Sequence, residues 1–493
     1  MLTAPPETPT RANYQVTFAI LLVAVSAYSL LQSLVNPVLP TLQHHLHTSQ
    51  NTVTWVLTAY LLSASVATPI MGRIGDMVGK KRMLVAALAT IAVGALLAAL
   101  ASNIGVMIVA RVIQGVGGAV LPLSFGIIRD EFPREKVTSA IGVAAALLAV
   151  GGGVGIVLAG PIVDTLDYHW LFWFPMIVVA IAAVGAHFVI PESTVRTPGH
   201  VSLLPAGLLT LWLVALIVAV SEGQIWGWTS ARTLGLAAAA VVFATGWVFA
   251  ELRSAQPLID MRMMRIPAVW TTNLVALLFG VSLYSAFAFL PEFVQTPRRA
   301  GYGFGASVTA SGVFLVPMTV TMFIFGLLSG RLAARVGSKM VLLAGSSISV
   351  VPFAILAFAH RDAWEIYLAT AILGAGLGFG FAAMSNLIVE SVPSTQVGVA
   401  SGMNANIRTI GGSIGAAVMA SIVTSGVAGG GLPKNSGYTN GFAFLMMAAI
   451  LASIACVIIP KTRRRELDVI AAAHVVEHGE TALVPGAGLV DAE

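Results

Sequence analysis

The chain has 493 residues, of which 57% are hydrophobic and only 10% charged, and its formal net charge is +5. Soluble proteins carry about 25% charged residues, so this composition excludes a soluble domain. The positive charge does not indicate nucleic-acid binding, because the Lys and Arg residues lie between long apolar segments. A single cysteine, Cys456, excludes an intrachain disulfide and a multi-cysteine metal site.

The apolar segments are roughly 20 residues long, which is the length a helix needs to cross about 30 Å of hydrocarbon. They are apolar on every face, so helices are expected rather than a closed barrel. We predict an all-α polytopic membrane protein with fourteen transmembrane helices, over residues 16–39, 53–74, 83–101, 105–128, 138–162, 170–190, 202–220, 233–251, 268–291, 307–331, 340–359, 364–390, 399–424 and 441–460.

The distribution of basic residues predicts the orientation. With both ends on one side, nineteen Lys and Arg residues lie on that side and five lie on the other. The positive-inside rule therefore places both termini in the cytoplasm, for a chain in the inner (cytoplasmic) cell membrane. We expect residues 1–14 to form a polar cytoplasmic tail without a cleavable signal peptide, and residues 461–493 to form a cytoplasmic C-terminal tail.

Helix 1 is followed by His44, His45 and His47, which we interpret as a solvated loop rather than a metal site, because a metal needs more ligands in fixed geometry. The sequence GRIGDMVGKKR then predicts a short loop, in which Gly72 and Gly79 permit a tight turn. The only acid in this loop, Asp76, can pair with the surrounding cations or with the positive end of a neighbouring helix. We predict a cytoplasmic gate formed by Gly72, Arg73, Asp76, Gly79, Lys80 and Lys81. The alternative is a basic loop that only fixes topology.

Helix 4 carries Arg111 and Gln114. An arginine in a span is costly and is expected to face the protein interior or a water-filled cavity. The alternative is that Arg111 reaches the nearby membrane interface along its aliphatic stem. Helix 5 is rich in glycine, which lets a helix approach its neighbour closely, and a proline bends it. The residues that we single out are Gly142, Gly151, Gly155, Gly160 and Pro161.

Few acids are available to carry a proton. Glu292 ends a helix 9 that is otherwise uncharged, and Asp164 ends helix 5. A carboxyl group in a partly dry cavity can load and release a proton near neutral pH. The remaining candidates are Asp130, Glu131, Glu222 and Glu390, which also lie at span ends. The alternative is a solvated acid at a helix end.

Several polar or aromatic residues within the spans are candidates to line a substrate cavity. Arg408 lies well inside helix 13, near one face with Asn404, and it can bind an acidic group of a substrate or clamp two helices together. The full set is Gln32, Asn36, Gln114, Asn273, Tyr284, Phe287, Phe325, Asn386, Asn404 and Arg408.

An internal repeat indicates the domain organisation. GRLAARVGSK, residues 330–339, matches GRIGDMVGKK, residues 72–81, but has Ala334 where the first copy has Asp76. The first copy follows span 2 and the second follows span 10. In a repeat of two six-helix halves the second copy would follow span 8, so two further spans must lie between the halves. We therefore predict bundles over residues 15–191 and 267–460, with two inserted helices and their loops over residues 192–266.

These motifs resemble the major facilitator superfamily, and the span count with WLFWFP (170–175), EGQIWGW (222–228) and ELRSAQPLIDMRMMR (251–265) resembles its fourteen-helix drug/proton antiporter branch. The resemblance implies that Arg111 influences proton coupling and that the helix 5 glycines form the antiporter motif. Three departures stand out. Met77 replaces a usual arginine, Ile156 replaces the proline of the antiporter motif, and Leu31 replaces a usual helix 1 aspartate.

We therefore expect a secondary transporter that exports hydrophobic or amphipathic small molecules, such as drugs and antibiotics, by alternating access and proton antiport. It is expected to act as a monomer in the lipid bilayer, with no cofactor, no metal and no nucleic acid, and with the proton gradient as its energy source. An enzyme is not expected, because no nucleophile–base pair appears at recognisable spacing. The alternatives are a uniporter or importer without proton antiport, and a non-transporting sensor on the same scaffold.

Overall fold

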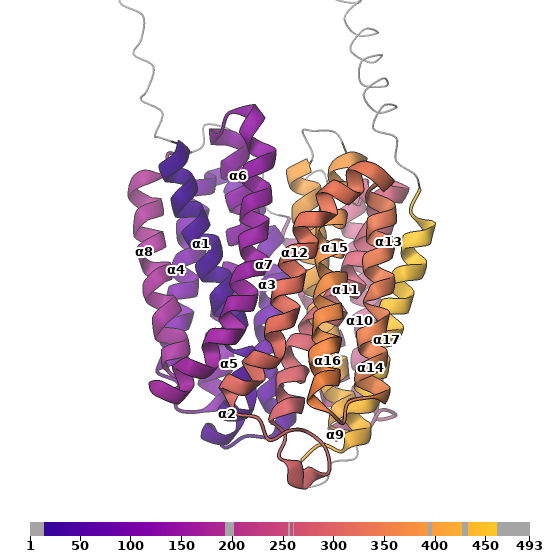
Figure 1. Cartoon of the computed structure of the whole chain (residues 1–493). Helices are drawn as coiled ribbons and strands as arrows, with labels where there is room; N and C mark the ends of the chain where they lie inside the picture. The colour runs from indigo at the N-terminus through magenta and orange to yellow at the C-terminus, as the bar shows by residue number, and fades with distance from the viewer. Residues whose placement is uncertain are drawn as a thin grey trace, which may run out of the picture.

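The structure is a computed structural model of the whole chain, and it describes residues 14–192, 202–254, 257–259, 261–392, 397–425 and 432–460. Every regular element in these ranges is helical (Figure 1). Thirteen helices among the described residues are long and apolar enough to cross a membrane. The 32-residue helix α7 (Arg134–Thr165) is long enough to be the fourteenth. The predicted all-α polytopic membrane fold with fourteen transmembrane helices is confirmed.

The first bundle contains six spans, drawn from indigo to magenta in Figure 1. Span 1 continues past α1 through a short 3₁₀ turn, and span 4 is divided into α5 and α6 by another. The elements are α1 (Tyr14–Leu34), η1 (Asn36–Val38), α2 (Leu39–His45), α3 (Gln50–Val78), α4 (Lys80–Ala99), α5 (Ile104–Val116), η2 (Gly117–Ala119), α6 (Val120–Glu131), α7 and α8 (Trp170–Val189).

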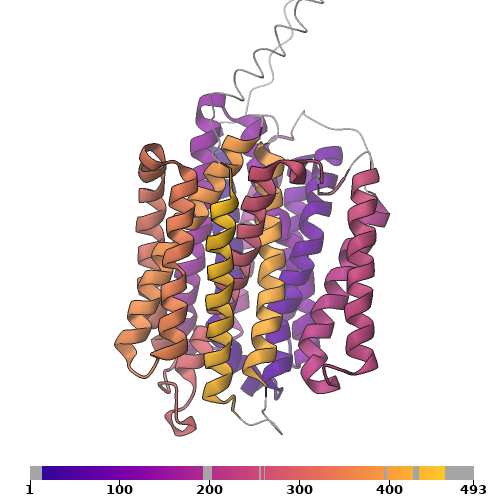
Figure 2. The ribbon, with the colours of Figure 1, turned by 90° about the vertical axis from the view of Figure 1, so that its right-hand side faces the viewer.

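Two inserted helices, α9 (Leu203–Trp226) and α10 (Ala231–Arg253), follow the first bundle. They pack against each other, and α9 also contacts α3 and α16. In Figure 2 this magenta pair stands at the edge of the molecule. The inserted pair therefore touches both bundles chiefly through α9, while α10 packs mainly against α9.

The second bundle also contains six spans, of which α13 and α14 together form one. It meets the first bundle mainly where α7 packs on α12 and where α3 packs on α16. The elements are η3 (Met263–Arg265), α11 (Pro267–Gln295), η4 (Arg298–Ala300), α12 (Val308–Val336), α13 (Ser338–Ile348), α14 (Val350–Phe358), α15 (Ala363–Ser391), α16 (Val397–Val423) and α17 (Asn435–Ile458).

The predicted loop at residues 72–82 is wrong in its extent. Helix α3 continues through Gly72 to Val78, and α4 begins at Lys80, so only Gly79 separates them. A glycine inside a helix costs only about 1 kcal/mol relative to alanine, which does not suffice to end the helix at Gly72. Gly79 ends it because its φ of 129° is a conformation that other residues rarely adopt.

The second copy of the repeat turns in the same way, since Gly337 has a φ of 87° between α12 and α13. Both turns follow even-numbered spans and therefore lie at the same end of the molecule. We call this end the basic end, and the opposite end the far end. The start of α1 and the end of α17 also lie at the basic end (Figure 1).

Candidate functional site

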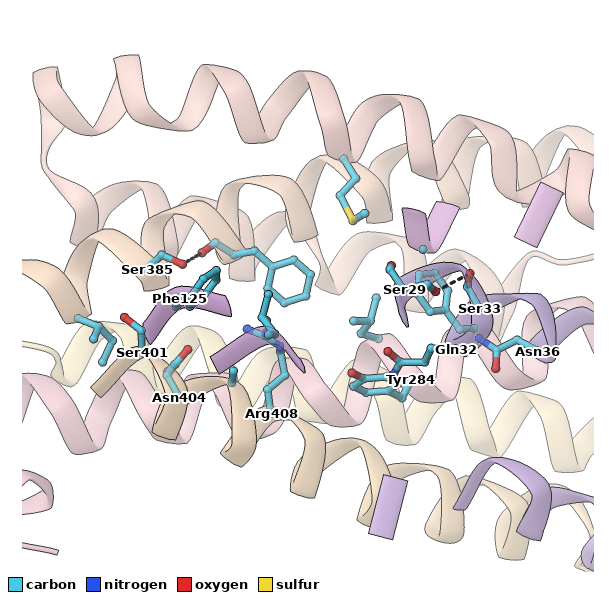
Figure 3. A pocket seen from close by; sticks show the side chains of 18 residues that line it. Ser29, Gln32, Ser33, Asn36, Phe125, Tyr284, Ser385, Ser401, Asn404 and Arg408 are labelled. Atoms are coloured by element: carbon cyan, nitrogen blue, oxygen red, sulfur yellow. Dashed lines mark hydrogen bonds between the residues drawn. The ribbon is translucent and has the colours of Figure 1, made fainter. Parts of the chain in front are cut away.

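A cavity lies between the two bundles. It is bounded by α1, α6 and α7 from the first bundle and by α11, α12, α15 and α16 from the second. Figure 3 shows its polar side chains spread along its length, with Asn36 toward one end and Ser385, Ser401 and Asn404 toward the other. Hydroxyl and amide groups alternate with aliphatic and aromatic side chains, so the cavity suits a molecule that is itself partly apolar.

Among the described residues, Arg408 is the only charged one that lines this cavity. Its guanidinium carbon lies 4.9 Å from the centre of the Phe381 ring, which provides a cation–π contact. No acidic side chain forms an ion pair with Arg408 in the part of the chain that the structure covers. An unpaired cation in a largely apolar cavity favours an anionic or electron-rich group and disfavours a second cation.

Six of the ten predicted cavity residues line the cavity, from α1, η1, α11 and α16. They are Gln32, Asn36, Tyr284, Phe287, Asn404 and Arg408. Whether these residues contact a substrate stays a prediction. In the structure Gln32 and Asn36 face the cavity from span 1, and Asn404 and Arg408 face it from α16.

Four predicted cavity residues do not line it: Gln114, Asn273, Phe325 and Asn386. Asn273 is buried behind Asn404, whose Nδ2 donates a hydrogen bond to its Oδ1 at 2.9 Å. Phe325 packs edge-on against another phenylalanine, on α15, at a centroid distance of 5.0 Å. Asn386 lies on a different face of α15, because the preceding residue, Ser385, is the one that faces the cavity.

Sequence reasoning missed the serines of the cavity. On α1, Ser29 and Ser33 line it together with Gln32 and Asn36, at a spacing of three and four residues. That spacing is a polar stripe on one helical face and could have been found from the sequence. Serine is a weak signal by itself, because its hydroxyl commonly bonds within the helix, as that of Ser33 does to the Ser29 carbonyl at 3.0 Å.

Arg111 is completely buried and does not reach the membrane interface. Its Nε donates to the Val56 carbonyl oxygen at 2.9 Å, and its Nη1 donates to the Gln114 Oε1 at 2.5 Å. Its guanidinium carbon lies 4.3 Å from the centre of the Tyr60 ring. Arg111 therefore ties α5 to α3, and Gln114 is occupied as its acceptor.

Glu292 is buried near the far end of α11, outside the cavity lining. The Tyr438 hydroxyl, from α17, donates to its Oε1, while its Oε2 has no hydrogen-bond partner in the described part of the chain. The side chain of Gln50, at the start of α3, lies beside the same carboxyl group. No cation is paired with Glu292 within the described ranges, so its charge is not compensated locally.

Tyr302 lies close to this acid in the segment between α11 and α12. Its hydroxyl donates to the Pro433 carbonyl oxygen. Burial raises the pKa of Tyr302 to about 12, and the negative charge of Glu292 acts in the same direction. Tyr302 therefore stays protonated at physiological pH and holds the segment that precedes α17 against the segment that follows α11.

The two bundles are hydrogen-bonded to each other at the far end. The Gln295 Nε2 donates to the Pro37 carbonyl oxygen at 2.6 Å, and the Thr309 hydroxyl donates to the exposed Asp164. The first bond joins the end of α11 to the first bundle, and the second joins the start of α12 to it. Asp164, predicted as a proton-coupling residue, is thus placed in the closure at the far end rather than in the cavity.

The glycines of α7 bring this helix close to its neighbours. A Cβ atom at Gly151 would lie 3.0 Å from the Ser29 Cβ, and one at Gly155 would lie 3.0 Å from the Leu30 carbonyl oxygen. One at Gly160 would collide with the backbone of Thr309 on α12. The helix therefore needs glycine to fit between α1 and α12. Pro161 lies inside the same helix, and so does Gly142, whose surroundings fall outside the described residues.

Lys80 is the most buried charged residue of the predicted gate. Its Nζ lies 2.7 Å from an Asp130 carboxylate oxygen and 3.4 Å from one of Asp76. The side chain of Asp130 is 5% exposed and that of Asp76 is 37% exposed, so Asp130 is the stronger partner. The sequence indicated Asp130 only as a candidate proton carrier at the inner end of helix 4, because its distance from Lys80 along the chain hid the pairing.

The sequence matches a known family over most of its length. The Major Facilitator Superfamily model matches residues 21–416 and 272–485. The chain belongs to this superfamily and is a membrane transporter rather than an enzyme.

Among curated proteins, the chain is 26% identical to the multidrug transporter protein MdtP of Bacillus subtilis (strain 168) over 381 residues, which cover 76% of this chain and 69% of that protein. It is 27% identical to the tetracenomycin C resistance and export protein of Streptomyces glaucescens over 398 residues, which cover 79% and 72% of the two chains.

Among solved structures, the fold is similar to that of the human organic anion transporter MFSD10 (TETRAN), with a TM-score of 0.63 and 15% identity over 92% of this chain and all 100% of that one. It is also similar to that of a mutant of the nucleoside transporter NupG, with a TM-score of 0.60 and 14% identity over 90% and 100% of the two chains. At these identities the likeness shows a common fold.

Proposed function

We propose that this protein exports hydrophobic or amphipathic small molecules, such as drugs and antibiotics, from the cytoplasm by proton antiport. The observation that carries the proposal is a mostly apolar cavity between two bundles, whose described lining has hydroxyl and amide groups and a single cation, Arg408. The names of the relatives, a multidrug transporter and an antibiotic export protein, support the direction and the substrate class. The protein would be a monomer in the inner membrane with both termini in the cytoplasm.

The mechanism would be alternating access by rocking of the two bundles. The hydrogen bonds from Gln295 to Pro37 and from Thr309 to Asp164 close the far end, which we assign to the outside. In the opposite state these bonds would break, and the gate around Asp76 and Lys80 would hold the cytoplasmic end closed. The structure would then correspond to the state in which substrate enters from the cytoplasm.

The proton would be exchanged at Glu292. This acid is buried, has no paired cation among the described residues, and lies where Gln50 of the first bundle meets the second. A charged carboxylate in such a place is costly, and hydration of the far end would relieve that cost. Protonation of Glu292 would therefore favour the closed far end, and loss of its proton would favour the open one. Asp164 and Arg111 remain the other proposed coupling residues.

Arg408 would select the substrate. Because no acid is among the described residues that line the cavity, a molecule with two positive charges would meet an uncompensated cation in a medium of low dielectric constant. A neutral or weakly acidic amphipathic molecule would instead place its apolar part against Phe287 and Phe381 and its acidic group on Arg408. Lipophilic weak acids and neutral drugs would therefore be transported in preference to dications.

The test is uptake of a fluorescent lipophilic carboxylic acid into proteoliposomes that carry a pH gradient. We expect accumulation that an uncoupler abolishes, and a loss of gradient-driven transport in Glu292→Gln with counterflow exchange retained. The matched control is Glu365→Gln, since Glu365 is not a candidate proton carrier and accepts hydrogen bonds from the Arg361 and Asp362 backbone N–H groups at the start of α15. Normal gradient-driven uptake by Glu292→Gln would show that the proton site is assigned wrongly.

A second candidate function is a uniporter or importer without proton antiport. It is favoured by the lack of an acid in the described cavity lining and by Leu31, which is fully buried on α1 where the resembling branch has an aspartate. In the same proteoliposomes this candidate predicts transport that follows the substrate gradient and ignores the pH gradient. A non-transporting sensor predicts no uptake of any tested compound.

A further inference from the structure

A groove opens between the two inserted helices at the basic end of the molecule. Its walls come from the first turns of α9 and the last turns of α10, and its volume is about 620 Å³. This volume lies within the range of about 300–1,000 Å³ that is typical of ligand sites. The groove is separate from the cavity between the bundles, since the two have no described lining residue in common.

The walls of this groove are apolar and uncovered. Leu203 is 80% exposed, Leu204 is 67% exposed and Phe249 is 55% exposed. These side chains belong to helices that span the membrane, so their uncovered faces meet lipid acyl chains rather than water. Gly246 leaves this part of the groove without a side chain. A Cβ atom there would lie in the groove, 3.7 Å from the Leu208 side chain.

A cation and two hydroxyl groups stand at the mouth of the groove. The exposed Arg253, in the last turn of α10, lies with its guanidinium carbon 6.0 Å from the centre of the Phe249 ring. No acidic side chain is paired with it in the part of the chain that the structure describes. The hydroxyls of Ser202 and Ser254 are 3.0 Å apart and bridge the two helices beside it.

We propose that this groove binds one anionic phospholipid, with an acyl chain between α9 and α10 and the headgroup phosphate on Arg253. The apolar walls match the acyl chain, and the unpaired guanidinium matches the phosphate, which an arginine can bind through two parallel hydrogen bonds. The lipid fills the groove between α9 and α10 at this end. If the basic end is cytoplasmic, as proposed above, the lipid comes from the inner leaflet; binding itself does not depend on that assignment.

The test is native mass spectrometry of the purified full chain with added phosphatidylglycerol or phosphatidylcholine of the same acyl chains. We expect one phosphatidylglycerol to stay bound under activation that removes phosphatidylcholine. A basic residue near a membrane surface contributes enough to anionic lipid binding that Arg253→Gln should weaken it about fivefold. Arg253→Lys should retain most of it.

The matched control is Arg335→Gln, which removes an exposed arginine from the last turn of α12 at the same end of the molecule. It should leave phosphatidylglycerol binding unchanged. Gly246→Leu should reduce binding of both lipids by filling the groove. Equal retention of the two lipids, or equal losses in Arg253→Gln and Arg335→Gln, would overturn the proposal. Because binding is read without transport, its failure would leave the proposed function untouched.

Discussion

The two copies of the repeated turn share a geometry and differ in their chemistry. In each copy a helix ends at a glycine with positive φ, and the residue after that glycine contacts an acid on another span. The turn after span 2 contacts the end of span 4, and the turn after span 10 contacts the end of span 12. In the first copy the Lys80 Nζ donates to Asp130, and in the second the Ser338 hydroxyl donates to Glu390, both at 2.7 Å. Both copies thus have an acidic acceptor at the same donor–acceptor distance, but the donor is a lysine in the first copy and a serine in the second.

The difference shows how one turn can be tied down in two ways. In the first copy two buried charges need each other, and Asp76 adds a second acid beside Lys80. In the second copy the donor is neutral, and Lys339 binds the carbonyl oxygens of Val457, at 2.8 Å, and of Ile459 at the end of α17. In the first copy, Lys80 can shift between Asp76 and Asp130 if the helices move. In the second copy, Lys339 holds the turn against the end of α17.

The largest expected effect comes from breaking the charged copy. Lys80→Met removes the buried cation of the Asp130 carboxylate and leaves it only the partly exposed Arg129, whose Nε lies 3.3 Å from Oδ1. Breaking a buried ion pair costs about 3–5 kcal/mol, and the remaining Arg129 places the expected loss toward the lower end of that range. We expect a marked fall in the unfolding temperature of the detergent-purified protein. Lys80→Met combined with Asp130→Asn should recover part of the loss, because the buried carboxylate charge that Lys80 compensated is then removed. If Lys80→Met unfolds no earlier than Ser338→Ala, the two copies do not differ as described.

The glycines of the two turns provide the next comparison. Gly79→Ala and Gly337→Ala each force a side chain into a strained conformation that costs about 1–3 kcal/mol. A Cβ at Gly79 would also lie 2.5 Å from the Glu192 Cδ, but this carboxyl group ends a flexible side chain and can turn aside at little cost; one at Gly337 meets nothing within 4 Å. Thermal unfolding should therefore show similar losses for Gly79→Ala and Gly337→Ala. A much larger loss in one of the two variants would contradict this interpretation.

A smaller effect is expected from the neutral copy. Ser338→Ala removes the donor to Glu390, but Glu390 is half-exposed, so water replaces most of the lost bond. We expect a loss of about 1 kcal/mol in the free energy of unfolding, which is typical of a single hydrogen bond. Ser338→Thr keeps the hydroxyl and serves as the control. A loss as large as that of Lys80→Met would mean that the second copy is as charge-dependent as the first.

The smallest effect on stability is expected at the acid that distinguishes the two copies. Asp76→Asn weakens a partly exposed pair that is worth about 0.3–0.5 kcal/mol, so the unfolding temperature should hardly change. Transport in proteoliposomes should nevertheless fall if Asp76 closes the cytoplasmic end. Ala334→Asp, which places an acid at the matching exposed position of the second copy, should change neither quantity. Unchanged transport in Asp76→Asn would remove Asp76 from the proposed gate.

Much of the cavity was predictable from helical spacing, and the rest was not. Gln32 and Asn36 belong to a polar stripe on α1, and Arg408 and Asn404 lie one turn apart on α16. Asn386 and Asn273 were expected in the same cavity, but the rotation of α15 presents Ser385 instead and Asn404 covers Asn273. Helices that are apolar all round carry little information about which face turns inward, so single polar residues on them are poor guides.

By itself the sequence determined that this chain is a bundle of fourteen membrane helices with a repeated turn, because a bilayer admits only segments that satisfy their own backbone and are long enough to cross it. Only the tertiary structure decided which distant polar groups meet. Lys80 and Asp130 are 50 residues apart and Glu292 and Tyr438 are 146 apart, and these pairs depend on how far each helix is rotated and tilted against its neighbours. In a membrane that rotation is set by close packing between helices, which hydropathy along the chain does not record.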